Sequence, residues 1–284
     1  MLFFYFREEN KMRIQHNMTA ANTNRQLGIT TGNLSKSTEK LSSGYAINRA
    51  ADNAAGLKIS EKMRGQIRGL NQASTNAEDG ISLVQTAEGA LNETTSILQR
   101  MRELTVQAAN DTNVSADRQS IAEEIKQLEE EVTRIANQTE FNTMKLLSGG
   151  LSKGVNLQIG ANAGQKITFS IASMNAKALG VSGLSKKVGS YSSASQAITT
   201  VQTALDKVTA QRSKLGATQN RLEYTISNAN NTAENLTTAE SRIRDVDMAA
   251  EMVNYSKNSI LQQAAQSMLA QANQSTQGVL SIIG

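Results

Sequence analysis

Residues 198–236 read ITTVQTALDKVTAQRSKLGATQNRLEYTISNANNTAENL, and they carry the most regular repeat in the chain. Selected positions recur at alternating spacings of three and four residues, which places them in one stripe along a helix. The repeat predicts a long coiled-coil helix over 194–236. Its members Arg212 and Gln219 are polar, and polar seam residues usually specify register or partner at a cost in stability. The stripe comprises Ile198, Val201, Leu205, Val208, Arg212, Leu215, Gln219, Leu222, Ile226, Ala229, Ala233 and Leu236.

Two earlier segments repeat the same pattern. Residues 57–110 carry an apolar side chain every seven residues, and one helix of that length would extend roughly 80 Å. A turn cluster at 110–113 separates it from a second helix, expected over 116–137. Such lengths predict a long antiparallel coiled-coil or helical-bundle rod, not an ordinary globular domain. The stripes are Leu70, Ala77, Val84, Leu91 and Leu98 in the first helix, and Ile121, Ile125, Leu128, Val132 and Ile135 in the second.

The helical period stops between residues 140 and 193, where glycines are frequent. Residues 155–159 and 166–171 alternate apolar and polar side chains, which is the period of a β-strand. The loop 160–165 between them suits a hairpin. We expect one small β-hairpin region here, inside a mainly α fold.

The two ends of the chain are expected to be helical but weak. Residues 16–41 and 239–280 carry sparse apolar stripes, and such helices gain little from intrinsic propensity in water. The last residues are strongly apolar, unlike the polar, frayed termini of most domains. We predict that these helices order when several copies pack together, as a polymerisation element does. The predicted polymerisation residues are Leu27, Leu34, Leu41, Val253, Ile260, Met268, Val279, Leu280, Ile282 and Ile283.

The composition argues against several classes of function. The chain has 284 residues, a net charge of +4, and no Cys, Pro or Trp. Lys and Arg are interspersed with acidic residues and form no basic stripe, so nucleic-acid binding is not expected. No segment is long and apolar enough to predict membrane insertion. Residues 1–11 lack the features of a signal peptide and are interpreted as a start-site extension ahead of Met12.

No constellation for catalysis, a cofactor or a metal is visible. The single histidine is His16, and there is no Cys nucleophile, Walker loop, GxGxxG or HExxH. Asp245, Asp247 and Glu251 are close in sequence, but the preference of acidic residues for a helix N-terminus explains them better than a cation site does. The acidic run 129–131 is interpreted as a solvated face, and the ten methionines mostly as core residues. We therefore expect neither an enzyme nor a cofactor.

Several motifs, in order from one end to the other, resemble bacterial flagellin. Residues 12–25 read MRIQHNMTAANTNR, and residues 39–56 read EKLSSGYAINRAADNAAG, a block diagnostic of that family. FNTMKLL at 141–147 and SRIRDVDMA at 241–249 resemble later segments of the family. The resemblance implies a short-form subunit, without large variable outer domains, that polymerises into the extracellular flagellar filament for motility.

The resemblance also implies how the chain is divided, with the terminal helices in an inner coiled-coil layer. Its partners would be other copies of the chain, a flagellar export chaperone, the type III export apparatus, and the filament cap and hook-associated proteins. The expected segments are the start-site extension 1–11, the N-terminal polymerisation helix and connector 12–56, the N-terminal rod helices 57–139, the small β region 140–193, the C-terminal rod helix 194–238 and the C-terminal polymerisation helix 239–284.

A sharper implication concerns LQRMREL at 98–104. This segment resembles the patch by which many flagellins engage Toll-like receptor 5, and Glu124 of the facing helix aligns with the same site. Exposed Arg side chains beside an apolar ridge also suit a binding hot spot. The alternative is contact with the next subunit, and both uses are compatible. The candidate patch comprises Leu98, Gln99, Arg100, Arg102, Glu103, Leu104 and Glu124.

Two other functions stay open on the sequence alone. A hook–filament junction protein would share these terminal blocks. A secreted coiled-coil adhesin would share the heptads, but it would need no apolar C-terminus.

Removal of residues 279–284 separates these alternatives. We expect the truncated chain, started at Met12, to fail to elongate short filament fragments, because the apolar end would no longer be buried by neighbouring copies. Electron microscopy of seeded reactions measures this, with the untruncated chain as the control. Filaments of equal length from both chains would contradict the prediction.

Overall fold

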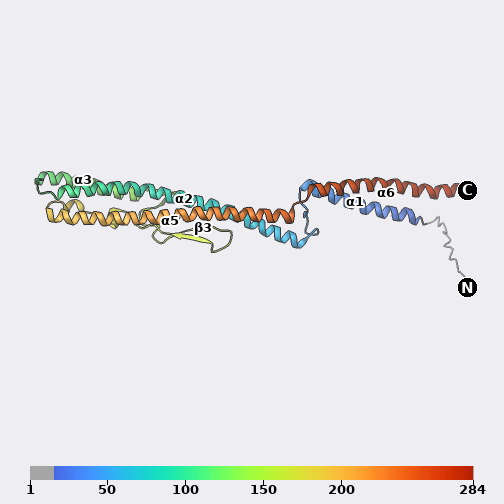
Figure 1. The fold of residues 1–284 in the computed structure, drawn as a ribbon, viewed down its shortest axis with the longest axis horizontal. Coiled ribbons are helices and arrows are strands. Elements are labelled where there is room, and N and C mark those ends of the chain that lie inside the picture. Colours follow the sequence, from blue (N-terminus) through green and yellow to red (C-terminus); the bar gives the residue numbers. More distant parts are fainter. Residues whose placement is uncertain (1–15, 284) are drawn as a thin grey trace. The chain divides into compact units, whose positions relative to one another are not determined.

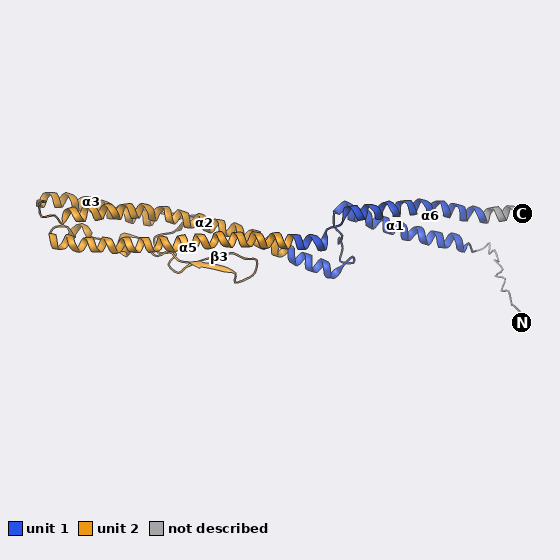
Figure 2. Ribbon diagram, in the orientation of Figure 1, with its two compact units in different colours: residues 1–63, 238–284 blue, residues 64–237 orange. Residues whose placement is uncertain are grey.

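The computed structural model describes residues 16–283, with side chains described as far as residue 275, and its fold is mainly helical (Figure 1). The expected mainly α class with a small β region is confirmed. The chain forms two compact units, residues 1–63 with 238–284 and residues 64–237 (Figure 2). The long helices are α1 (Met18–Ser43), α2 (Ala54–Ala108), α3 (Ser115–Gln138), α5 (Tyr191–Arg244) and α6 (Met248–Ile283).

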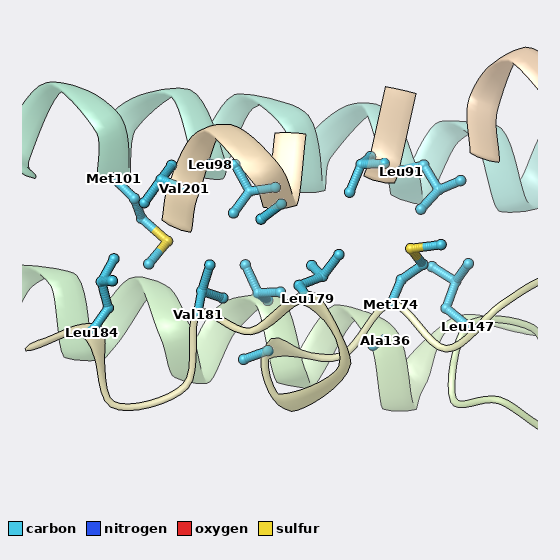
Figure 3. Packing of buried hydrophobic residues seen from close by; sticks show 14 of the residues in the cluster. Leu91, Leu98, Met101, Ala136, Leu147, Met174, Leu179, Val181, Leu184 and Val201 are labelled. Atoms are coloured by element: carbon cyan, nitrogen blue, oxygen red, sulfur yellow. The ribbon is translucent and has the colours of Figure 1, made fainter. Parts of the chain in front are cut away.

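The second unit, residues 64–237, buries its apolar stripes inside the chain. Helices α2, α3 and α5 lie side by side and share one hydrophobic core (Figure 1). Glu88 of α2 pairs with Arg212 of α5, whereas Gly80 of α2 lies by Leu222, so α2 and α5 run antiparallel. The loop segment that precedes α5 completes the core beneath α2 and α3 (Figure 3). The fully buried residues of this shared core include Leu91, Leu98, Met101, Ile125, Leu147, Leu179 and Val201.

About half of the residues predicted for the seam of α5 are buried, and the other half are not. Val201, Val208, Leu215 and Leu222 are buried as predicted. In the alternate layers, the buried residue lies one position before the predicted one. The predicted residue beside it is only partly buried. Ala197, Ala204 and Thr218 are small and let the helices pack closely. The longer Gln211 is held by its side-chain amide, which donates to the Ser170 carbonyl at 3.1 Å. The residues predicted to be buried but found half-buried are Ile198, Leu205, Arg212 and Gln219. The residues buried in their place are Ala197, Ala204, Gln211 and Thr218.

The break between the last two helices also lies later than predicted. The sequence placed it between residues 236 and 239, but α5 continues to Arg244. The Thr237 hydroxyl donates to the carbonyl of Ala233 one turn earlier, so this side chain is accommodated within the helix. The break falls at 245–247, where the Val246 amide donates to the Gly44 carbonyl instead.

The region 139–190 is richer than the single hairpin that was predicted. The predicted hairpin is present as an antiparallel pair, but a second two-stranded pair and two short helices accompany it. The turn of the extra pair places Asn142 and Thr143 at φ of 48° and 64°. The elements are β1 (Glu140–Phe141), β2 (Met144–Lys145), β3 (Val155–Gln158), β4 (Lys166–Phe169), α4 (Ala176–Leu179) and the 3₁₀ helix η1 (Leu184–Lys187).

Two glycines of α2 make room for the β3–β4 hairpin. A Cβ atom at Gly80 would lie 2.3 Å from Leu157, and one at Gly69 would lie 2.8 Å from the Cβ of Ala161. The side-chain amide of Asn76, between them on α2, donates to the Gln158 carbonyl at 3.1 Å. The hairpin is therefore seated close to the helix backbone, and at Gly69 the backbone of Ala161 leaves no room for a side chain.

Glu129 is not part of a solvated face, contrary to the prediction for 129–131. Its carboxylate is half-buried and accepts hydrogen bonds from the amides of Gly183 at 2.7 Å and Ser185 at 2.9 Å. Both amides belong to the start of η1, where backbone donors lack intrahelical partners. Glu129 thus ties the segment before α5 to helix α3, whereas Glu130 is exposed as predicted.

Replacement of Glu129 by Ala tests this anchor. Loss of the two charge-assisted hydrogen bonds should lower the free energy of unfolding by about 1–3 kcal/mol. Urea denaturation followed by circular dichroism measures the change. Glu130→Ala, on the same helix but exposed, is the matched control and should change stability little. Equal effects of the two substitutions would contradict the anchoring role.

Candidate functional site

The first unit is built around an antiparallel pair formed by α1 and α6. The side-chain amide of Asn17, which also caps α1, donates to the Ala272 carbonyl at 2.9 Å. At the other end of the pair, Lys40 lies 3.9 Å from the carboxylate of Glu251. These two contacts fix the register of the chain's first and last helices.

The contact seam of this pair contains many polar or small side chains. On α1, the predicted residues Leu27, Leu34 and Leu41 are half-buried in the seam, and they alternate with Thr30 and Ser37, which are buried. On α6 the seam positions alternate at spacings of four and three and contain few large apolar residues. They are Glu251, Tyr255, Asn258, Gln262, Ala265, Leu269 and Ala272. A seam of this composition buries little apolar area and stabilises the isolated pair weakly.

The predicted apolar stripe of α6 faces away from this seam. Val253, Ile260 and Met268 are 68%, 66% and 66% exposed. We define the outer face of α6 by these residues and three further exposed apolar ones, Met248, Met252 and Leu261. The predicted residues Val279, Leu280, Ile282 and Ile283 have side chains that lie outside the described residues.

The segments that join these helices to α2 and α5 are clasped by Arg244. Its guanidinium bonds to Glu61 and lies 4.8 Å from the ring centre of Tyr45. The Ala46 amide donates to the Arg244 carbonyl at 2.7 Å, beside a β-bridge between Tyr45 and Asp245. The last residue of α5 therefore holds the loop between α1 and α2 in place.

The acidic residues near Arg244 cap a helix or form an ion pair. Asp247 accepts hydrogen bonds from the amides of Ala249 and Ala250, which makes it the N-terminal cap of α6. Glu251 faces Lys40 instead of a shared cation position. Within residues 16–283, no group of three or more His, Cys or acidic side chains could hold a metal ion. No helix in this described range has the length and apolarity needed to cross a membrane.

The candidate patch in the second unit is organised by Arg100. Its guanidinium donates to Glu124 of α3 at 3.0 Å and to Glu103, one turn along α2, at 3.1 Å. The hydrogen bond with Glu124, followed by that with Glu103, raises the pKa of Arg100 above its usual value. These three residues, predicted from two separate segments, are brought together on the surface.

The structure divides the remaining patch residues between surface and core. Leu98 and Leu104 are buried, as Figure 3 shows for Leu98, so they hold α2 in place and offer no apolar ridge. Gln99, Arg102 and Glu103 line an open hollow of about 600 Å³. The hollow is completed by Gln107 and by Val106, which is 51% exposed and was not predicted. The heptad spacing of Leu98 to the buried Leu91 indicated its burial.

Comparison with known proteins links these features to one family. The bacterial flagellin N-terminal helical region matches residues 14–151, and the bacterial flagellin C-terminal helical region matches residues 198–283. A flagellin of Halalkalibacterium halodurans is 52% identical over 272 residues, which cover 96% of this chain and all of the relative. The chain belongs to the bacterial flagellin family. It is therefore a structural subunit of the extracellular flagellar filament and not an enzyme.

Other flagellin relatives match over a similar share. A flagellin of Bacillus subtilis is 50% identical over 303 residues, and the flagellar filament 33 kDa core protein of Treponema phagedenis is 51% identical over 285. Each match covers 96% of this chain and all of the relative. Full coverage by such short relatives confirms the expected short form, and it favours a filament subunit over a junction protein or an adhesin.

The fold is shared beyond the filament proteins. A solved flagellar hook-associated protein of Vibrio parahaemolyticus aligns with 69% of this flagellin and 98% of its own chain, with a TM-score of 0.58. The two sequences are 12% identical, so this likeness shows the common fold alone.

Proposed function

We propose that this flagellin polymerises through α1 and α6, and that the outer face of α6 is the surface that neighbouring copies cover. The observation that carries the proposal is the exposure of this face. It holds large apolar side chains from Met248 to Met268 of one helix, while the seam residues face α1. Exposed apolar patches of this kind mark protein interaction surfaces.

The energetics support assembly through this face. Burial of a large apolar side chain stabilises by about 1.5–3 kcal/mol, and the outer face offers several. Helix α6 contains only two charged residues, Glu251 and Lys257, so little charge must be desolvated when copies pack together. A weakly charged, apolar surface of a second copy is therefore a well-matched occupant.

The geometry of the contact favours a filament over a closed ring. An apolar surface on one copy that meets a different surface on the next makes a heterologous contact, and such contacts generate open helical assemblies when the rotation does not close. The weak α1–α6 seam fits this role, because the pair can gain most of its stability from neighbours. The terminal segments 12–56 and 239–284 would form the inner layer.

The exposed outer face of α6 implies that a chaperone protects the subunit before assembly. An apolar helix face on an unassembled subunit is an aggregation hazard. We infer that an export chaperone covers α6 until the subunit enters the type III export apparatus, and that the filament cap and hook-associated proteins contact the assembled ends. Flagellin family membership supports these partners.

Polar substitutions on the outer face test the polymerisation surface. Val253→Ser with Ile260→Ser should slow seeded filament elongation by roughly 100-fold, because two apolar side chains would no longer be buried. Light scattering and electron microscopy measure elongation. Gln263→Ser, an exposed polar position on the same helix, is the matched control and should elongate seeds normally. Unchanged elongation of the double variant would assign polymerisation to another surface.

We also propose that the Arg100 patch of the free subunit binds Toll-like receptor 5. Gln99, Arg100, Arg102 and Glu103 are exposed on α2, and Glu124 extends the surface onto α3. Arg side chains held in place by ion pairs suit an interface because little rotamer freedom is lost on binding. The buried Leu98 and Leu104 contribute by fixing the position of α2.

Replacement of Arg100 by Ala tests receptor recognition. We expect the potency of pure monomer in a receptor reporter-cell assay to fall about tenfold, as for a hot-spot residue. The melting temperature should stay near that of the unmodified chain, because exposed ion pairs contribute little to stability. Lys126→Ala, which removes an exposed ion pair on α3, is the control. Equal potency of all three proteins would exclude Arg100, and no response to any would remove the proposal.

A further inference from the structure

Only some of the methionines of this flagellin lie in the core, where most of them were predicted. Met101 and Met174 are buried in the second unit, with 0% and 4% of their surfaces exposed. In contrast, the three methionines of α6 lie on its outer face. Met248, Met252 and Met268 are 48%, 51% and 66% exposed. A flexible apolar thioether therefore occurs repeatedly on the surface that we assign to polymerisation.

We propose that Met248, Met252 and Met268 form an oxidation site that controls whether a free subunit can join the filament. This inference rests on the proposed function of the outer face. The oxidant class is a two-electron oxygen donor such as hydrogen peroxide. The thioether sulfur attacks one peroxide oxygen, a sulfur–oxygen bond forms as the oxygen–oxygen bond breaks, and water leaves. Sulfur is oxidised by two electrons and the peroxide is reduced.

The chemical consequence opposes assembly. A sulfoxide is polar and accepts hydrogen bonds, whereas the thioether is apolar. Val253, Ile260 and Leu261, the other residues that define the outer face, offer no side-chain donor, although exposed donors such as Ser256 and Lys257 lie between them in the sequence. Burial of a sulfoxide against a matching apolar helix would leave its oxygen without a partner, which is costly. Oxidation therefore turns an apolar docking face into one that prefers water.

Solvent exposure decides which methionines of the chain react with peroxide. There is no Cys to compete for the oxidant. Reaction follows exposure, so the buried Met101 and Met174 should resist oxidation while the second unit stays folded. Met18 on α1 and Met144 on β2 are also exposed, at 72% and 38%, but neither lies on the outer face of α6. They serve as internal comparisons.

The test uses the full chain as soluble subunit, treated with hydrogen peroxide, freed of peroxide and added to filament seeds. Peptide mass spectrometry locates the added oxygen atoms. We expect oxygen on the three α6 methionines and elongation slowed about tenfold or more, because polar groups resist burial. Treatment with methionine sulfoxide reductases of both stereospecificities should restore elongation. This reversal depends on no variant and keeps the test valid if a substitution disturbs folding.

A variant with Met248, Met252 and Met268 all replaced by Leu should elongate seeds before and after peroxide, because Leu keeps the size and apolarity of Met. Met144→Leu is the control and should remain peroxide-sensitive. Normal elongation of the fully oxidised, unsubstituted chain would overturn the inference and leave the proposed function intact. Peroxide sensitivity of the triple variant would also overturn it. Failure of the untreated, unsubstituted chain to elongate seeds would instead refute the proposed function.

Discussion

A long helix in water must bury its apolar stripe against something, and the two units of this flagellin meet this constraint differently. In residues 64–237 the stripes of α2, α3 and α5 face one another, and the core is complete within one chain. In the other unit, the seam between α1 and α6 mixes half-buried leucines with Thr, Ser, Ala and Gln, and most of the large apolar residues of α6 are exposed. The second unit thus buries its apolar stripes within one chain, whereas the first leaves much of its apolar surface exposed.

The connection between α1 and α2 follows from the same division. A weak helix pair cannot fix its own linkers by packing, and polar contacts do so instead. The Arg244 guanidinium bonds to Glu61 and lies over the Tyr45 ring, and the Arg244 carbonyl accepts a hydrogen bond from the Ala46 amide. Asp247 caps the N-terminus of α6. Glu129 has a similar role in the second unit, where it anchors η1. In both units, single charged side chains bind backbone amides or linker residues where the regular helices end.

The sequence predicted the helices, the β3–β4 hairpin and the Arg100 cluster, because each depends on local periodicity or on a family motif. It was less successful at deciding which of two adjacent stripes is buried. Size and hydrophobicity favoured Ile198 and Leu205 of α5, but close packing selects Ala197 and Ala204. On α6 the same preference selected Val253 and Ile260, which are exposed because small and polar residues form the seam with α1. Contacts between distant segments, such as Glu129 with Gly183, leave no periodic signal.

The short break at 245–247 has a thermodynamic consequence. Because α5 ends at Arg244 and α6 begins with its own cap at Asp247, no continuous ladder of helical hydrogen bonds joins them. The α1–α6 pair can therefore open while the core of α2, α3 and α5 stays closed. Amide protons of α6 in the free subunit should exchange with solvent by local opening, at a free energy far below that of global unfolding. The free subunit then unfolds in more than one transition, and the transition of residues 64–237 reports the stability of their own core.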